Sequence, residues 1–148
     1  MVDSNVLNVK KRNGRGLEPL NIDKIHEMVE YACEDISGVS SSLVEMNSGL
    51  QLYDNIPTEQ IQQILIKSAS DLISLENPNY QFVASRLLLF SLRKQINRRL
   101  WDHPHLYEMV KKCVELGVYD KDILKWYDKS EFDRMNTMIN HDRDYTFT

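Results

Sequence analysis

Residues 9–24 read VKKRNGRGLEPLNIDK, and this stretch decides the amino-terminal part of the fold. Its basic residues 10–12 run into Asn13-Gly14, a strong hairpin signal because a tight two-residue turn needs positive φ at both central positions. The segment from Asn21 onward has the pattern of a helix N-terminus, where exposed N–H groups attract anions and Lys24 adds a full charge. The stretch therefore predicts a cationic β-hairpin that leads directly into a helix. A site for an anion and a merely solvated basic turn are both compatible with it.

The composition describes an ordinary globular chain. A length of 148 residues predicts one domain with room for an appendage, and 42% hydrophobic and 27% charged residues are typical of a folded protein. The net charge of −4 argues against sequence-independent binding of nucleic acid, which needs a broad basic face. A local basic cluster on an acidic background favours a small anion instead.

Cysteine and histidine usage predicts neither a disulfide framework nor a metal site. Cys33 and Cys113 are far apart and form no Cys-x-x-Cys pattern, so both are expected to be reduced, buried thiols on helix faces. The four histidines share no metal-ligand spacing on a helix face. The sequence contains no signal peptide and no apolar run long enough to span a bilayer, so we expect a cytoplasmic protein.

Apolar residues that recur at three- and four-residue steps predict helices along most of the chain. Four are expected in its first two thirds: one from Ile22 that Gly38 ends, a short one with a Ser42–Glu45 capping box, one with Thr58 as N-cap, and a long one from Asn79 to about Arg98. Further helices are expected over 106–116, over 120–126 and from Ser130, with Gly117 just after the first of them. No strand pattern is found beyond the hairpin. The expected fold is mainly α (α+β), with an N-terminal β-hairpin lid over a four-helix bundle and a small helical appendage.

Three segments, read in order, resemble an ATP-cone, a nucleotide-binding regulatory domain. They are VKKRNGRGLEPLNIDKI at 9–25, LQLYDNIPTEQIQQILIKSASDLIS at 50–74 and NPNYQFVASRLLLFSLRK at 77–94. The continuation, with YEMVKKCVELGVYDKDIL at 107–124 and FDRMNTMINHDRDYTF at 132–147, resembles the segment after the cone in the large subunit of class I ribonucleotide reductases. The resemblance implies a regulatory domain over residues 6–98 and, over 99–148, a helical segment leading toward a catalytic barrel that this chain lacks.

The resemblance also implies a set of nucleotide-binding residues. Matches to the family's phosphate-binding cations are Lys11, Arg12, Lys24 and Lys94. Glu18 and Asn21 match the positions that read the adenine edge, and Thr58 matches a polar contact. The apolar walls around base and sugar correspond to Val9, Ile25, Ile61, Leu65 and Phe90, for which plain core packing stays an equal alternative.

The sequence departs from the family pattern in two ways. The hairpin is one residue longer, so placing Glu18 rather than Leu17 on the adenine depends on where the insertion falls. Gln62 and Ser91 stand where well-studied members carry histidines beside the nucleotide. The resemblance therefore implies binding of an adenine nucleotide, whereas inhibition by dATP is left open at these two positions.

By this resemblance the chain regulates and does not catalyse. ATP or dATP would be the effector, with Mg²⁺ carried by the nucleotide, and would set overall activity and oligomeric state. The expected partners are the remainder of the reductase large subunit, the radical-bearing small subunit and further copies through the cone, with no nucleic acid and no membrane. Two isolated cysteines cannot supply the reductase chemistry, so no catalytic residue is assigned. A degenerate cone that acts only as a subunit-interaction module is the alternative.

Overall fold

The computed structural model describes residues 7–12, 16–49, 53–97 and 103–146. The chain forms two compact units, a first unit of residues 1–92 with 146–148 and a second unit of residues 93–145. Mostly helical structure with a small sheet near the N-terminus confirms the predicted fold class. The predicted boundary at residues 98 and 99 lies outside the described residues.

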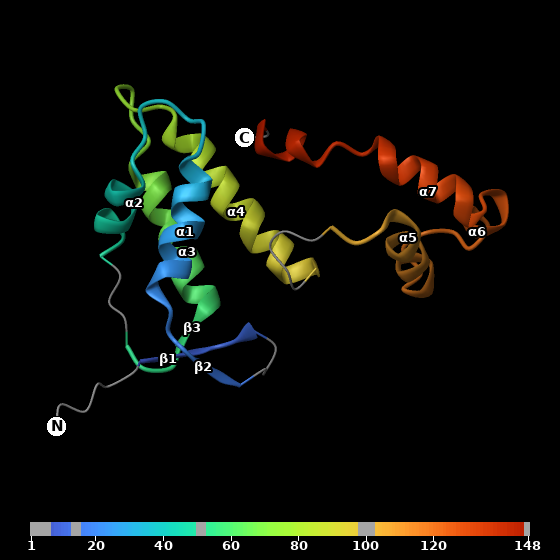
Figure 1. The fold of residues 1–148 in the computed structure, drawn as a ribbon, viewed down its shortest axis with the longest axis horizontal. Coiled ribbons are helices and arrows are strands. Elements are labelled where there is room, and N and C mark those ends of the chain that lie inside the picture. The colour runs from blue at the N-terminus through green and yellow to red at the C-terminus, as the bar shows by residue number, and fades with distance from the viewer. Residues whose placement is uncertain (1–6, 13–15, 50–52, 98–102, 147–148) are drawn as a thin grey trace. The chain divides into compact units, whose positions relative to one another are not determined.

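A three-stranded sheet begins the first unit (Figure 1). β1 (Asn8–Lys10) pairs antiparallel with β2 (Leu17–Pro19), and Val9 lies opposite Glu18. The Lys11 N–H donates to the Gly16 carbonyl at 3.1 Å, which extends the hairpin beyond the paired strands. The predicted Asn13-Gly14 turn lies outside the described residues.

The third strand was not predicted from the sequence. β3 (Ile56–Pro57) runs parallel to the other edge of β1, so the prediction of a hairpin without further strands is wrong. A strand of two residues has no period to detect. Its position depends on Asp54, whose carboxylate accepts hydrogen bonds from the Asn8 backbone N–H at 2.8 Å and from the Asn8 amide at 3.2 Å. The Asn55 N–H donates in turn to the Asn8 carbonyl at 2.8 Å.

Four helices form the body of the first unit: α1 (Ile22–Cys33), α2 (Ser41–Ser48), α3 (Thr58–Asp71) and α4 (Tyr80–Asn97), of which α4 runs on into the second unit. Figure 1 shows the sheet at one end of α1 and α3. Their shared core is apolar, and its fully buried members are Val29, Ala32, Val44, Ile56, Leu65, Ala69, Val83, Leu87 and Phe90. Polar contacts also join the helices. For example, the Asn47 amide of α2 donates to the Ser68 carbonyl of α3 at 3.1 Å.

Several helix ends differ from the sequence predictions. The N-cap of α2 is Ser40 and not Ser42, and Thr58 is the first residue of α3 rather than its N-cap. α1 ends at Cys33, five residues before Gly38, because the backbone already leaves the helical region at Glu34, where ψ is 135°. Neighbouring serines and threonines offer nearly equal capping chemistry, so the packing of the helix decides which one is used.

The second unit contains α5 (Leu106–Glu115), α6 (Ile123–Trp126), α7 (Lys129–Met138) and most of the 3₁₀ helix η2 (His141–Thr146). Phe132 of α7 is buried, with its ring centroid 5.7 Å from that of Tyr107 on α5. α7 begins with a capping box of Asp128 and Glu131, so the predicted start at Ser130 is wrong by two residues. The predicted role of Gly117 agrees with the structure, where it follows α5 with φ of 71°.

Arg93 is a buried cation in the described part of the second unit. Its guanidinium donates to the Asp144 carboxylate at 2.9 Å and to the Tyr145 hydroxyl at 3.0 Å, and it lies 5.2 Å from the centre of the Tyr145 ring. These bonds, led by the one to Tyr145, raise the pKa of Arg93 against the lowering effect of burial. Among the described residues no helix is long and apolar enough to cross a membrane.

Candidate functional site

The two arms of the hairpin are joined by an ion pair between residues expected to bind a nucleotide. The Lys11 ammonium lies 2.8 Å from the Glu18 carboxylate. This hydrogen bond is the main cause of a lowered pKa at Glu18, and the charges of Lys11 and Lys24 lower the same pKa further. Glu18 is therefore ionised at neutral pH and can only accept hydrogen bonds.

The N-terminus of α1 follows directly. Asn21 is its N-cap, and the Asn21 side-chain oxygen accepts a hydrogen bond from the Lys24 backbone N–H at 3.2 Å. An open pocket of about 610 Å³ is lined by residues 18–24, which include Glu18, Asn21 and Lys24. This volume is in the range of small-molecule sites. Three of the expected ligand residues therefore share one concave surface at a helix N-terminus.

Arg12 reaches from the hairpin to α3 and α4. Its guanidinium donates to the Ser91 carbonyl and the Ser91 hydroxyl, each at 3.1 Å, and to the Gln62 side-chain oxygen at 3.4 Å. Both positions were expected to face the nucleotide, and the structure shows them in contact with a predicted phosphate ligand. Neighbouring Lys11, which like Arg12 follows the end of β1, contacts Glu18 instead.

The expected apolar residues belong mainly to the core of the first unit. Leu65 and Phe90 have no exposed surface, and Val9 and Ile61 are buried as well. The Phe90 ring lies 5.9 Å from the Tyr31 ring. Core packing accounts for these four residues without a ligand. The remaining two expected contacts, Ile25 and Thr58, are half-buried.

Lys94 lies on α4, three residues after Ser91, and is half-buried. It belongs to the second unit, whereas Lys11, Arg12 and Lys24 belong to the first. The structure brings Lys11, Glu18 and Lys24 together, and separately Arg12, Gln62 and Ser91. The convergence of all four cations on one polyanion stays a prediction.

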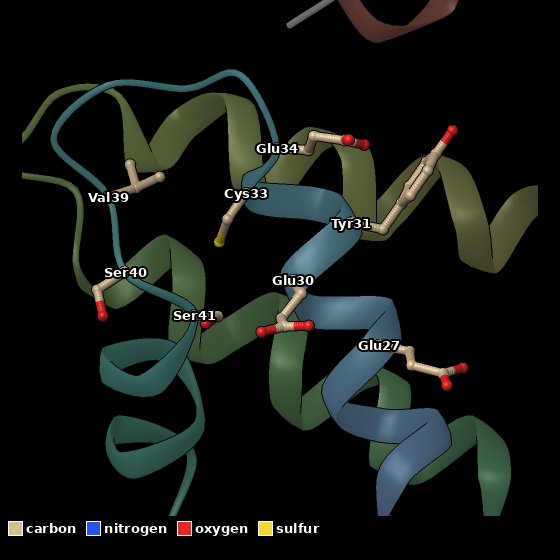
Figure 2. Close-up of a pocket in the computed structure, with 8 residues that line it drawn as sticks. All are labelled: Glu27, Glu30, Tyr31, Cys33, Glu34, Val39, Ser40 and Ser41. Atoms are coloured by element: carbon tan, nitrogen blue, oxygen red, sulfur yellow. The ribbon is translucent and has the colours of Figure 1, made fainter.

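A second pocket, of about 630 Å³, lies between the end of α1 and the start of α2 (Figure 2). Glu27, Glu30 and Glu34 line it, and carboxylates repel a phosphate, so it does not suit a nucleotide. Figure 2 shows the Cys33 thiol directed from the end of α1 toward the segment that leads into α2. Burial raises the pKa of Cys33 to about 11. Both cysteines are free and half-buried, rather than fully buried as predicted.

Metal chemistry by the protein itself has no support in the part of the chain that is described. There, no three acidic, histidine or cysteine side chains are placed to hold a metal ion.

One contributor to the site, the backbone carbonyl of Ser91, was not predicted from the sequence. No side-chain pattern reveals which carbonyl an arginine 79 residues away will bind.

The sequence of this chain is similar to those of known proteins. The chain is similar to the alpha subunit of ribonucleoside-diphosphate reductase 1 from Escherichia coli, with 46% identity over 140 residues, which is 95% of this chain and 18% of that protein. It is also similar to the alpha subunits from Haemophilus influenzae (44% identity, 96% of this chain, 18% of that protein) and Helicobacter pylori strain 26695 (40%, 96% and 17%). The chain thus spans less than a fifth of these relatives. The sequence model of the ATP cone domain matches residues 7–95. The chain therefore belongs to the ATP cone domain family.

Proposed function

We propose that this chain binds an adenine nucleoside triphosphate where the hairpin meets α1, α3 and α4, and that the bound nucleotide regulates a ribonucleoside-diphosphate reductase. The observation that carries the proposal is the pocket of residues 18–24, which joins an ionised acceptor, a helix N-terminus and a cation. Lys11 and Arg12 precede it on the same hairpin. A triphosphate needs several such charges, since charge-assisted hydrogen bonds are the strong ones.

The pocket offers hydrogen-bonding groups that match the adenine edge. The adenine edge carries an exocyclic amine that donates and a ring nitrogen that accepts. Glu18 accepts only, and the Asn21 amide keeps its two N–H donors when its oxygen caps α1. Mg²⁺ would be bound by the phosphates of the nucleotide.

The family match and the reductase relatives support the regulatory role. The effector would set overall activity and oligomeric state, with the rest of a large subunit and a radical-bearing small subunit as partners in the cytoplasm. Such regulation requires that ATP or dATP bind differently to two states of the assembly. The reduction itself would take place elsewhere in the large subunit.

One observation favours a second candidate, a subunit-interaction module without a ligand. The Arg12 guanidinium already has three acceptors from Gln62 and Ser91. Calorimetric titration of the chain with ATP, dATP and GTP in the presence of magnesium separates the two candidates. Heat with ATP and little with GTP supports the nucleotide site. The absence of heat at high micromolar ATP would favour the interaction module.

The mutation that tests this site is Lys11→Ala. Loss of a hydrogen bond to a charged group should weaken ATP binding by roughly 1.5–3 kcal/mol, with little change in thermal stability. Lys67→Ala is the matched control, because Lys67 is an exposed lysine on α3 that pairs with Asp71 at 2.6 Å. An unchanged dissociation constant for Lys11→Ala would remove the hairpin from the site.

A further inference from the structure

Arg12 is held in place by atoms from two helices that are distant in sequence. Its contacts with Gln62 and Ser91 cross 50 and 79 residues, at 3.4 Å to the Gln62 amide oxygen and 3.1 Å to each Ser91 oxygen. Such a fixed arginine on a hairpin is unusual, because a long side chain on a turn normally keeps its rotamer freedom.

The bundle itself determines the orientation of Gln62. The side chain is only 2% exposed, and its amide nitrogen donates to the Leu87 carbonyl at 3.3 Å and lies 3.8 Å from the Met28 sulfur. A carboxamide whose nitrogen is used in this way presents its oxygen as an acceptor on the other side. The acceptor for Arg12 is therefore set by α1 and α4 rather than by the hairpin.

The contacts leave Arg12 able to bind an anion. A guanidinium has five N–H donors, and the three contacts use at most three of them. Gln62 and the Ser91 oxygens are uncharged, so they orient Arg12 without neutralising it. Lys11 differs, because its partner is the Glu18 carboxylate. A cation already held in a binding geometry loses less side-chain entropy when its ligand arrives.

We propose that Gln62 and Ser91 are positioning residues that hold Arg12 as a fully charged, preoriented ligand for the phosphates of the nucleotide. This inference rests on the proposed function. It predicts that both residues act on ATP affinity only through Arg12.

A double-mutant cycle on the intact chain tests the inference, with MgATP affinity measured by calorimetry. Ser91→Ala and Gln62→Met should each weaken ATP binding by roughly three- to tenfold, the effect of one hydrogen bond. In an Arg12→Ala background the same two substitutions should cause no further loss. Ser91→Thr keeps the hydroxyl and should retain most of the affinity.

The matched controls are Gln63→Met, the exposed neighbour of Gln62, and Ser70→Ala, whose hydroxyl donates to the Ile66 carbonyl of its own helix. Neither should change ATP affinity. Because Gln62 is buried, Ser91→Ala tests the inference on its own should Gln62→Met fail to fold. If Ser91→Ala lowers ATP affinity equally in the unmutated chain and in the Arg12→Ala background, the positioning role is overturned.

A measurement without nucleotide separates failure of this inference from failure of the proposed function. In the free chain, nitrogen-15 NMR should show slowly rotating Arg12 guanidinium groups, and Ser91→Ala should make them rotate fast. Fast rotation in the unmutated chain would contradict the inference. A chain that holds Arg12 rigidly but shows no heat with ATP would instead refute the nucleotide site on which the inference depends.

Discussion

The two units of this chain are stabilised in different ways. Among the described residues, fourteen buried apolar side chains lie in the first unit and two, Val110 and Phe132, in the second. The second unit depends more on single polar contacts, such as the bond of the Leu106 N–H to the Asn136 side chain at 2.9 Å and the pairing of Arg93 with Asp144. A buried apolar core gives the first unit stability of its own, whereas the second unit depends on a few contacts.

This difference has a functional meaning. Under the proposed function the nucleotide pocket needs a stable frame, and the buried core of the first unit, shared by α1, α3 and α4, supplies one. A segment with little core of its own can change its conformation at low free-energy cost, which suits a connection between a regulatory site and the rest of an enzyme.

The largest expected effect comes from Phe132→Ala, because Phe132 is one of only two buried apolar residues described in the second unit. Truncation of a buried phenylalanine costs roughly 3–5 kcal/mol, which should abolish the packing of α5 against α7. Hydrogen exchange of the intact chain should show lost protection in the second unit and unchanged protection in α1 and α3. Met138→Ala on the same helix, 73% exposed, is the control. Equal loss of protection in both units would mean that they fold as one.

A similar substitution in the first unit should leave that unit folded, because its buried core is larger. Leu65→Ala should lower the free energy of unfolding by roughly 2–5 kcal/mol, because Leu65 is fully buried, yet leave α1 to α4 folded. Denaturant unfolding followed by circular dichroism measures the loss. Leu75→Ala, at a fully exposed position, should change little. Equal free energies of unfolding for Leu65→Ala and Leu75→Ala would contradict the difference drawn between the two units.

The smallest expected effect is a dependence on pH that belongs to the first unit. His26 of α1 lies 2.8 Å from the Glu45 carboxylate of α2 and 3.1 Å from that of Glu30. The Glu45 hydrogen bond, and then the charges of Glu45 and Glu30, raise the pKa of His26 above 6.5. A raised folded-state pKa gives stability that is full below the unfolded value and is lost as pH rises through the folded value.

His26→Gln should therefore reduce stability in mildly acidic solution and have no effect in alkaline solution. Chemical denaturation at several pH values, combined with NMR titration of the His26 ring, measures both quantities. The control is His105→Gln in the second unit, where His105 lies 3.4 Å from Asp133. A His26 pKa at or below its ordinary value would contradict this account.

The sequence predicted the elements better than their ends. Helical periodicity placed α1, α3 and α4 because their apolar stripes pack into one core. Caps were misplaced by one or two residues, as at Ser40, Thr58 and Asp128, since several polar residues near each start can cap a helix. The strand β3 was missed because long-range bonds between Asn8 and Asp54 place it, and no local pattern records them.

For the candidate site, the sequence predicted residue types but not their partners. The chain order placed Glu18, Asn21 and Lys24 in one short segment, and they line one pocket. The contacts of Arg12 with Gln62 and Ser91 depend on how α3 and α4 pack, which periodicity does not determine. The sequence alone therefore does not decide whether Gln62 and Ser91, at positions expected to carry histidines, mark a lost nucleotide site or an altered one.

The sheet also bears on how copies of this chain could associate. Both of its outer strands contain a proline, Pro19 in β2 and Pro57 in β3, while β1 lies between them. Proline has no N–H to donate. The Leu20 N–H is directed inward to the Leu7 carbonyl at 2.7 Å, so Pro19 faces the outer edge of β2 and leaves a gap in the row of backbone donors there. Among the described residues, the β2 edge is therefore poorly suited to pairing with a strand from another copy of the chain.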